Sequence, residues 1–186
     1  MRRVVILALA LAACGEPAVT VVPEAELPQD VFGSPRPETL TELPESTIVY
    51  FVLGGRLIAV PRQLPAEAPS LPAAAMEALL QGPSSPWKTA IPEGTRLLSV
   101  EVDGIVATVD LSDEFELSAP GHRLALRVAQ VVYTLTETPP VEAVLFRIEG
   151  SPADVLTGRD EVVQGSVTRA HYQRFAPLER DESEAD

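Results

Sequence analysis

Residues 98–111 read LSVEVDGIVATVDL, and this stretch decides the fold. Apolar and polar residues alternate on both sides of Asp103-Gly104, a pattern typical of two antiparallel strands joined by a two-residue type I′ turn. With that turn, Val102 lies opposite Ile105, and one face of the hairpin is apolar throughout. The apolar face comprises Leu98, Val100, Val102, Ile105, Ala107, Val109 and Leu111. The sequence therefore predicts a hairpin with one buried face and one face in water.

A long amphipathic helix is predicted downstream of this hairpin. Its apolar stripe consists of Leu124, Ala125, Val128, Ala129, Val131, Val132 and Leu135. These positions recur at helical spacing and form a stripe wide enough to cover the apolar face of the hairpin. We therefore expect a helix packed on an antiparallel sheet.

A second hairpin is predicted ahead of the first. Residues 48–53 and 56–60 are apolar runs on either side of Gly54-Gly55, and Pro61 is expected to end the second run. The first run is apolar on both of its faces. This pattern predicts a strand in the centre of a sheet.

A short helix and further strands complete the predicted elements. Ser70 is a candidate N-cap for a helix over residues 71–81, which Gly82-Pro83 ends. Residues 141–148 read as a strand, and residues 155–169 have room for one or two short strands.

Length and charge limit the class of protein. The chain has 186 residues, 46% of them hydrophobic, which is enough for one substantial core with tails. Its formal net charge is −13. A chain this acidic would be repelled by a nucleic-acid backbone and by an anionic bilayer surface, so a basic partner, or simple solubility, is the better expectation.

The first residues resemble a bacterial lipoprotein signal. Arg2 and Arg3 precede an apolar run over residues 4–13, and Leu11-Ala12-Ala13-Cys14 resembles a lipobox that ends at the chain's single cysteine. The run is shorter than the roughly 20 apolar residues that a membrane span needs. We expect a signal peptide over residues 1–13 and a lipidated Cys14. The alternative is an ordinary secretory signal in which Cys14 is incidental.

The segments at both ends of the predicted domain are tether-like. Residues 14–47 are rich in proline and glutamate and are expected to form a disordered tether, and residues 176–186 an acidic, disordered tail. The alternative is that residues 19–22 or 31–32 dock on the domain as an extra strand. The folded domain is expected over residues 48–175.

Several motifs in this domain together resemble one known family, the GerMN domain, also called the sporulation and spore germination domain. They are VYF (49–51), LIAVPR (57–62), ALLQGPS (78–84), AIPEGT (90–95), ATVDLS (107–112), AQVVYTLT (129–136) and VLFRIEG (144–150). The resemblance implies an α+β, ring-building-motif-like fold, with two helices packed on one face of a small mixed or antiparallel sheet and an extra hairpin. It also implies a non-enzymatic, extracytoplasmic module for interaction or assembly in the cell envelope, and it does not imply that the organism sporulates.

The residues themselves give no sign of catalysis or metal binding. His122 and His171 are the two histidines, and no histidine or cysteine stands at metal-ligand spacing from either. No nucleophile elbow, phosphate-binding loop or dinucleotide fingerprint is present. The acids Asp110, Asp113, Glu114 and Glu116 fit a solvated turn better than a carboxylate dyad or a calcium loop. We therefore predict no catalytic residue, no cofactor and no metal.

Trp87 and Gln130 are the candidate contact residues. Trp87 lies in a proline-bounded loop, where it either plugs the edge of the core or anchors a partner. Gln130 is polar amid apolar neighbours, so it either faces water, bonds a loop carbonyl or contacts a partner. Tyr133 and Thr134 are expected to be a half-buried aromatic and a helix residue bonded to its own backbone.

Two functional classes remain open. In the first, an exposed strand edge with apolar neighbours docks another envelope protein or a second copy of the chain. In the second, a groove around Trp87 and the turn over residues 110–115 binds a wall glycan or peptide. Aromatic residues make up 5% of the chain, which leaves little from which to build a sugar platform. The favoured function is a lipid-anchored interaction module on the extracytoplasmic face of the cell membrane.

Overall fold

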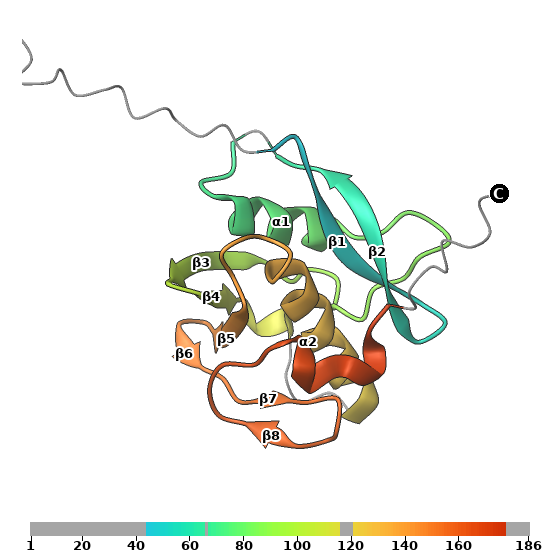
Figure 1. The fold of residues 1–186 in the computed structure, drawn as a ribbon, viewed down its shortest axis with the longest axis vertical. Coiled ribbons are helices and arrows are strands. Elements are labelled where there is room, and N and C mark those ends of the chain that lie inside the picture. The colour runs from blue at the N-terminus through green and yellow to red at the C-terminus, as the bar shows by residue number, and fades with distance from the viewer. Residues whose placement is uncertain (1–43, 66, 116–120, 178–186) are drawn as a thin grey trace, which may run out of the picture. The chain divides into compact units, whose positions relative to one another are not determined.

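The computed structural model describes residues 44–65, 67–115 and 121–177 (Figure 1). In chain order the elements are β1 (Ser46–Leu53), β2 (Arg56–Gln63), α1 (Leu71–Leu80), β3 (Leu97–Asp103), β4 (Val106–Leu111), the 3-10 turn η2 (Asp113–Phe115), α2 (Gly121–Leu135), β5 (Ala143–Ile148), β6 (Ser151–Pro152), β7 (Val155–Leu156), β8 (Val162–Val163) and the 3-10 segment η3 (Arg169–Phe175). The predicted signal peptide and almost all of the predicted tether and tail lie outside the described residues.

The main sheet is mixed. Its strands follow the order β3-β4-β5-β6, with β4 and β5 parallel and the other neighbouring pairs antiparallel. Ala107, Val109 and Leu111 of β4 are fully buried on one face, beside Val144 and Phe146 of β5. This apolar face packs against the helices, which confirms the predicted α+β fold.

The β3–β4 hairpin forms where it is predicted but in a different register. Asp103 pairs with Val106, so the turn is Gly104-Ile105 rather than Asp103-Gly104. Gly104 has a φ of 58°, whereas Ile105 has no positive φ. A type I′ turn needs positive φ at both central residues, and a type II′ turn needs it at the first alone. The predicted type I′ turn is therefore wrong, because glycine takes the first central position.

A bulge changes which side chains this hairpin buries. It lies between Leu97 and Ser99 and takes Leu98 out of the ladder, so that Leu98 is 45% exposed. Ile105, now in the turn, is 50% exposed. The predicted apolar face therefore loses both residues to solvent, and Val102, which stays on that face opposite Ala107, is 41% exposed. Val100, Ala107, Val109 and Leu111 remain on the side of the sheet that faces the core.

Both helices lie between the main sheet and the β1–β2 hairpin (Figure 1). α1 packs on β3 from one side and on β1 from the other. It begins as predicted, because the Ser70 side chain accepts a hydrogen bond from the Ala73 amide at 3.3 Å. It ends at Leu80 with Gln81 as its C-cap, and Gly82 follows with a φ of 81°, in the left-handed region that favours glycine.

α2 is buried on all of its sides. Every residue from Leu124 to Leu135 is buried, including the polar ones. The apolar stripe predicts an amphipathic helix, whose polar side would face water. That side is buried instead. The reason is the second hairpin: β1 covers the side of α2 that would otherwise face water, while β5 and β7 pack on other sides.

The β1–β2 hairpin forms a separate two-stranded sheet. The predicted central position of β1 is therefore wrong. Among the described residues, the backbone pairing of its second edge is a single bridge from Val52 to Lys88 of the α1–β3 loop. β2 also continues through Pro61 to Gln63. Proline is tolerated there because β2 is an edge strand.

The last part of the described chain closes the far side of β5. The predicted strand over residues 141–148 is β5, and β7 and β8 form the short strands expected after it. Val167 bridges to Val144 through two backbone hydrogen bonds of 2.8 and 2.9 Å. The η3 segment then packs against α2. β6 and Val167 therefore cover the β5 side of the sheet, whereas β3 lies at its open edge.

Candidate functional site

Three buried polar side chains lie along one side of α2. Arg127, Gln130 and Thr134 are three and four residues apart, a spacing that puts them on one face of a helix. Their exposed fractions are 3%, 0% and 0%. Buried polar groups need hydrogen-bond partners, and each of these finds its partners on the backbone of a neighbouring element.

Gln130 joins β1 to the loop between α1 and β3. Its Nε2 donates to the Tyr50 carbonyl at 2.9 Å. Its Oε1 accepts from the Ala90 amide at 2.6 Å and from the Thr89 hydroxyl at 3.3 Å. With no exposed surface and both ends of the amide engaged, Gln130 is not available to a partner. This placement contradicts the predicted contact role of Gln130 and assigns it to the architecture of the domain.

Thr134 completes the contact with β1. Its Oγ1 accepts from the Tyr50 amide at 3.1 Å, so Gln130 and Thr134 together satisfy both backbone groups of Tyr50. Two side chains of α2 thus satisfy the backbone N–H and C=O of Tyr50, which a neighbouring strand would satisfy in a wider sheet. This arrangement is the physical reason for the glutamine and the threonine in the motif AQVVYTLT.

Arg127 holds the same loop from one helical turn earlier. Its Nε donates to the Ala90 carbonyl at 3.0 Å, and its Nη1 donates to the Phe115 carbonyl. The guanidinium also lies 5.7 Å from the centre of the Phe115 ring. Sequence reasoning missed Arg127 as a buried residue. The available signal was the recurrence of polar side chains at 127, 130 and 134 within an otherwise apolar helix.

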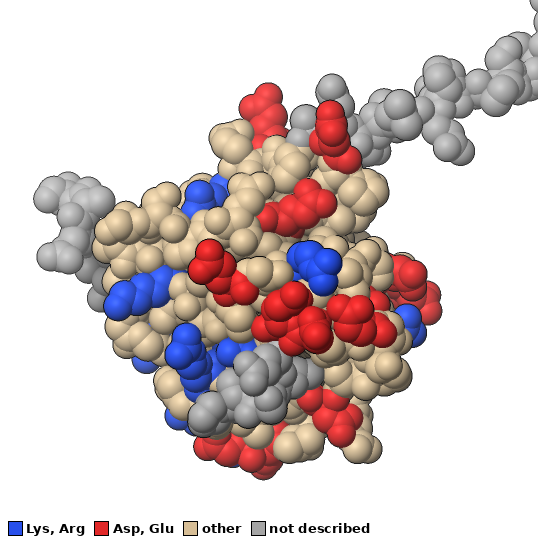
Figure 2. Space-filling model, turned by 180° about the vertical axis from the view of Figure 1, so that it is seen from behind, with Lys and Arg blue, Asp and Glu red and all other residues tan. Residues whose placement is uncertain are grey.

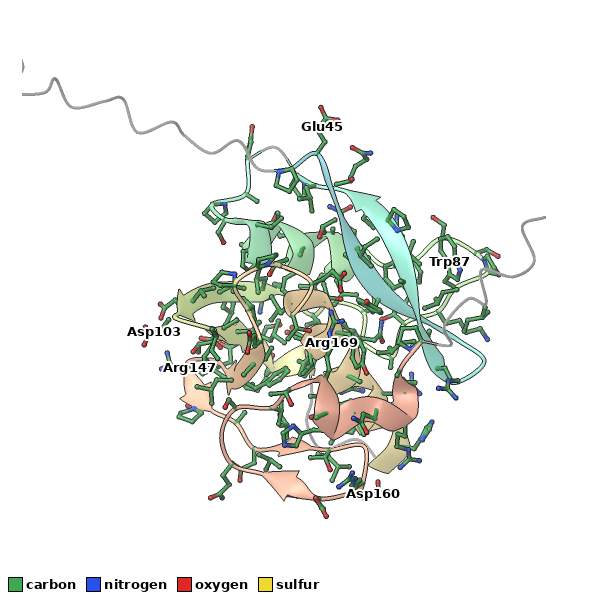
Figure 3. The ribbon with its side chains drawn as sticks, in the orientation of Figure 1. Glu45, Trp87, Asp103, Arg147, Asp160 and Arg169 are labelled. Atoms are coloured by element: carbon green, nitrogen blue, oxygen red, sulfur yellow. The ribbon has the colours of Figure 1, made fainter. Side chains whose placement is uncertain are left out.

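Trp87 lies in this fixed loop. Its amide donates to the Ser84 carbonyl at 3.1 Å, and the next residue, Lys88, bridges to Val52. The side chain is half-buried against the core. Figure 3 shows it close to the β1–β2 hairpin, on the opposite side of the domain from Asp103. Both predicted roles of Trp87 remain compatible with this placement, since one part of the ring packs and another part meets solvent.

Two of the sequence motifs meet at one surface pocket of about 350 Å³. ALLQGPS supplies the end of α1, and AIPEGT supplies the facing part of the loop. The lining residues are Leu79, Leu80, Gln81, Gly82, Thr89, Ile91, Pro92, Glu93 and Gly94. None of them is aromatic, so the pocket offers no stacking surface for a sugar ring.

The β3 edge is an open surface of the described domain that carries three exposed apolar side chains. Five of the seven β3 residues are exposed, and β3 pairs with β4 alone. Leu98, Val102 and Ile105 are 45%, 41% and 50% exposed. Within residues 44–65, 67–115 and 121–177, no backbone hydrogen bond joins the outer edge of β3 to another segment. We refer to β3 with the Gly104-Ile105 turn as the β3 edge.

An aromatic and charged cluster fastens η3 to α2 and β1. Arg169 pairs with Glu137 at 2.5 Å and lies 5.6 and 5.0 Å from the ring centres of Tyr50 and Tyr133. The Tyr50 hydroxyl donates to the same Glu137 carboxylate at 3.0 Å. In Figure 3, Arg169 reaches toward the middle of the domain. Tyr133 is 5% exposed, so it is more deeply buried than the predicted half-buried aromatic.

This cluster predicts a loss of stability at alkaline pH. Burial raises the pKa of the Tyr50 hydroxyl from 10.0 to about 12, with the Arg169 charge opposing the shift. The neutral form therefore stabilises the fold below pH 10, and this contribution disappears as the pH rises toward 12. We expect Tyr50 to account for about 2–3 kcal/mol of that loss. The measurement is the melting temperature between pH 8 and pH 12.

Tyr50→Phe is the control for this prediction. Burial also raises the pKa values of Tyr133 and Tyr172, so the variant should keep an alkaline decline that is shallower than that of the unmodified protein. Identical pH profiles for the two proteins would contradict a role for the Tyr50 hydroxyl.

The carboxylates of Asp110, Glu114 and Glu149, near the end of β4, have partners within the domain. Asp110 accepts from the Gly150 amide at 3.1 Å, and Glu149 accepts from the Asp113 amide at 3.3 Å. Arg96 lies 3.8 Å from Glu114. Among the residues that the structure describes, no group of three or more His, Cys, Asp or Glu side chains could hold a metal ion. Glu116 lies outside the described residues.

The two histidines also have local partners. His122 Nδ1 lies 3.2 Å from the Arg174 guanidinium. His171 Nδ1 accepts from the Thr168 amide at 3.0 Å, which fixes the start of η3. Neither ring is paired with a second candidate metal ligand in these contacts.

Cys14, the predicted lipidation site, lies outside the described residues. Of the described helices, none has the length and apolar character needed to cross a membrane.

Comparison with known proteins supports the resemblance seen in the motifs. A family model described as "Germane: Sporulation and spore germination" matches residues 48–154, more than half of the chain. A search of curated sequences gave no match.

Solved structures share the fold. The first GerMN domain of the sporulation protein GerM from Bacillus subtilis matches with a TM-score of 0.51 at 23% identity, covering 66% of this chain and 98% of that chain. The tandem GerMN domains of the same protein match with a TM-score of 0.54 at 21% identity, covering 67% of this chain and 46% of that one. A Clostridium perfringens protein classed as a candidate lipoprotein matches with a TM-score of 0.50 at 17% identity, covering 71% and 92%.

The range matched by the family model contains the motifs that form the site. ALLQGPS and AIPEGT line the pocket at the end of α1, and AQVVYTLT provides Gln130 and Thr134 to the β1 edge. The chain therefore belongs to the sporulation and spore germination family and carries a GerMN-type domain.

Proposed function

We propose that this protein is a lipid-anchored lipoprotein of the cell envelope whose GerMN domain is a non-catalytic interaction module of the sporulation and germination type. Cys14 carries the lipid, and the domain lies on the extracytoplasmic face of the membrane. The lipobox-like sequence and the fold shared with a candidate lipoprotein support the anchor. No cofactor is required, and the partner is another envelope protein or a second copy of the chain.

The observation that carries this proposal is the open β3 edge. An edge strand offers unpaired backbone donors and acceptors to an incoming chain. Natural domains usually protect such an edge with charges or bulges, and β3 has the bulge at Leu98 together with Glu101 and Asp103. Three large apolar side chains nevertheless stand exposed along it. The addition of a strand to a sheet edge is a recognised mode of protein interaction.

A wall glycan or peptide bound near Trp87 is the second candidate function. The half-buried Trp87 on a fixed loop supports it, because a preorganised aromatic is a good anchor. The pocket next to this loop is lined without aromatics, however, and in the turn over residues 110–115 the Asp110 carboxylate is already engaged by the Gly150 amide. We therefore favour protein interaction.

Site-directed photo-cross-linking in native membranes tests the choice. A photoreactive residue at Ile105 samples the β3 edge, and one at Val162, which is 66% exposed on β8, is the matched control. We expect Ile105 to link reproducibly to one envelope protein or to a second copy, and Val162 to link to neither. A third position, Trp87, samples the loop.

Two outcomes would contradict the preferred function. Equal labelling from Ile105 and Val162, or none, would remove the β3 edge as the docking surface. Links from Trp87 that disappear on enzymatic digestion of the wall glycan would favour the glycan-binding alternative.

Lipid attachment is tested separately by a Cys14→Ser variant. We expect it to leave the membrane fraction, because a membrane anchor of acyl chains depends on the cysteine that carries them. Fractionation followed by mass spectrometry of the N-terminal peptide measures the change. A Cys14→Ser protein that stays in the membrane fraction would show that the cysteine is incidental.

A further inference from the structure

We propose that the β3 edge receives an extended segment in which apolar and basic residues alternate. This inference rests on the proposed interaction function and names the chemistry of the partner.

The turn fixes which backbone groups of β3 face outward. Asp103 and Val106 flank the two-residue turn, so they form a hydrogen-bonded pair with each other. Hydrogen-bonded and non-hydrogen-bonded pairs alternate along an antiparallel ladder. Val102, which pairs with Ala107, and Val100, which pairs with Val109, therefore direct their N–H and C=O groups away from β4. These two valines present the backbone that a new strand would bind.

The side chains of β3 divide by face. Val100 and Val102 lie on the face that packs on the helices, since their partners Val109 and Ala107 are fully buried there. Glu101 and Asp103 lie on the opposite face and are exposed. A strand added at this edge would continue both faces. Its apolar residues would meet Val100 and Val102, and its other residues would meet two carboxylates.

The charges around the edge select a basic partner. β3 carries no basic residue, and neither Glu101 nor Asp103 forms an ion pair within the described part of the chain. Arg147, on the same outer face, lies on β5 in register with Asp110 of β4. Glu142 adds a further carboxylate beside the turn, where its amide donates to the Ile105 carbonyl at 2.8 Å. Figure 2 shows acidic side chains gathered across the middle of the face seen from behind, with single basic side chains among them.

The same charges disfavour a second copy of this chain as the occupant. Two β3 strands side by side would bring Glu101 and Asp103 of both copies onto one shared face. Like charges on neighbouring strands destabilise the pairing, whereas opposite charges stabilise it. A segment of alternating apolar and basic residues can bind the outward backbone groups of β3. It also packs on Val100 and Val102 and pairs with the carboxylates of Glu101 and Asp103.

Binding of a labelled peptide to the full-length protein in detergent tests this inference. The first peptide alternates valine and lysine, the second has the same composition in two blocks, and the third replaces lysine by glutamate. We expect the alternating lysine peptide to bind at least about tenfold more tightly than either of the others at low salt, and to weaken as salt rises. Fluorescence anisotropy measures the dissociation constants.

Two variants make the result specific. Glu101→Lys combined with Asp103→Lys should reverse the preference toward the glutamate peptide, which a merely structural effect would not do. Val102→Pro should abolish binding of the alternating peptide, because proline removes a donor on the outward side of β3 and is tolerated on edge strands. Equal binding of the alternating and block peptides, or an unchanged preference in the double variant, would overturn the inference.

The proposed function and this inference fail in different ways. If Ile105 cross-links to an envelope protein and the double variant leaves that link unchanged, the interaction function stands and the basic segment is wrong. If Ile105 links two copies of this chain, the occupant is a second copy and the inference is likewise wrong. If the lysine peptide binds but no link forms in membranes from Ile105, the proposed docking function is wrong.

Discussion

A Val131→Asp variant should lose its cooperative fold or melt at a much lower temperature. Val131 is 0% exposed and lies in the middle of α2, which is buried on all of its sides. A carboxylate at this position must either remain charged in an apolar environment or take up a proton. Arg127, one turn earlier, already donates to the Ala90 and Phe115 carbonyls. We expect a loss of at least about 4 kcal/mol in the free energy of unfolding.

For a chain of this length, that loss corresponds to a fall of at least about 10 °C in melting temperature. Circular dichroism during heating measures it. Arg123→Asp is the matched control, because Arg123 lies in the first turn of the same helix and is exposed. An acidic residue is favourable near a helix N-terminus, so the control should change stability by no more than about 0.5 kcal/mol. An unchanged melting temperature for Val131→Asp would show that this face of α2 is not buried.

A Gln130→Met variant is expected to produce the second largest loss. Methionine is close to glutamine in size, so the substitution removes hydrogen bonds with little change in volume. It leaves the Tyr50 carbonyl and the Ala90 amide without their side-chain partner inside the core. Each buried group left unsatisfied costs about 1–3 kcal/mol, so we expect a loss of about 3 kcal/mol. Chemical denaturation with urea measures it.

Gln173→Met is the control for this substitution, because Gln173 is exposed on η3. The same change there should be nearly neutral. Equal effects at the two positions would contradict the role assigned to the Gln130 amide. A selective loss at Gln130, accompanied by faster hydrogen exchange in the loop around Ala90, would show that Gln130 fixes that loop.

Local patterns in the sequence predict most of the elements. The alternation in residues 98–111 indicates the β3–β4 hairpin, and the 3.6-residue recurrence after His122 indicates α2, because each pattern reflects contacts within one element. Ser70 and Gly82 mark the ends of α1, because capping depends on the few residues beside the helix. The motifs were also sufficient to indicate the family.

The candidate site was predicted less well. Trp87 lies in the loop where it is expected, and its contact role stays a prediction. The predicted contact role of Gln130 is wrong. The sequence does mark Gln130 as a residue that needs a hydrogen-bond partner, because it is polar and lies among valines, and it finds that partner inside the domain. The register of the β3–β4 hairpin is also wrong. Both Asp103-Gly104 and Gly104-Ile105 allow a two-residue turn, and the bulge at Leu98 has no signature in the alternation.

The sequence by itself determined the elements, their order and the family of this protein, because helical period, strand alternation, caps and motifs are properties of neighbouring residues. Tertiary structure alone decided the burial of α2, the partners of Gln130 and the openness of the β3 edge. Gln130 meets Tyr50 across 80 residues and Ala90 across 40, and periodicity carries no information about contacts so distant in the chain. Whether a strand lies at an open edge likewise depends on the order of all strands in the sheet, which pairing between distant segments decides.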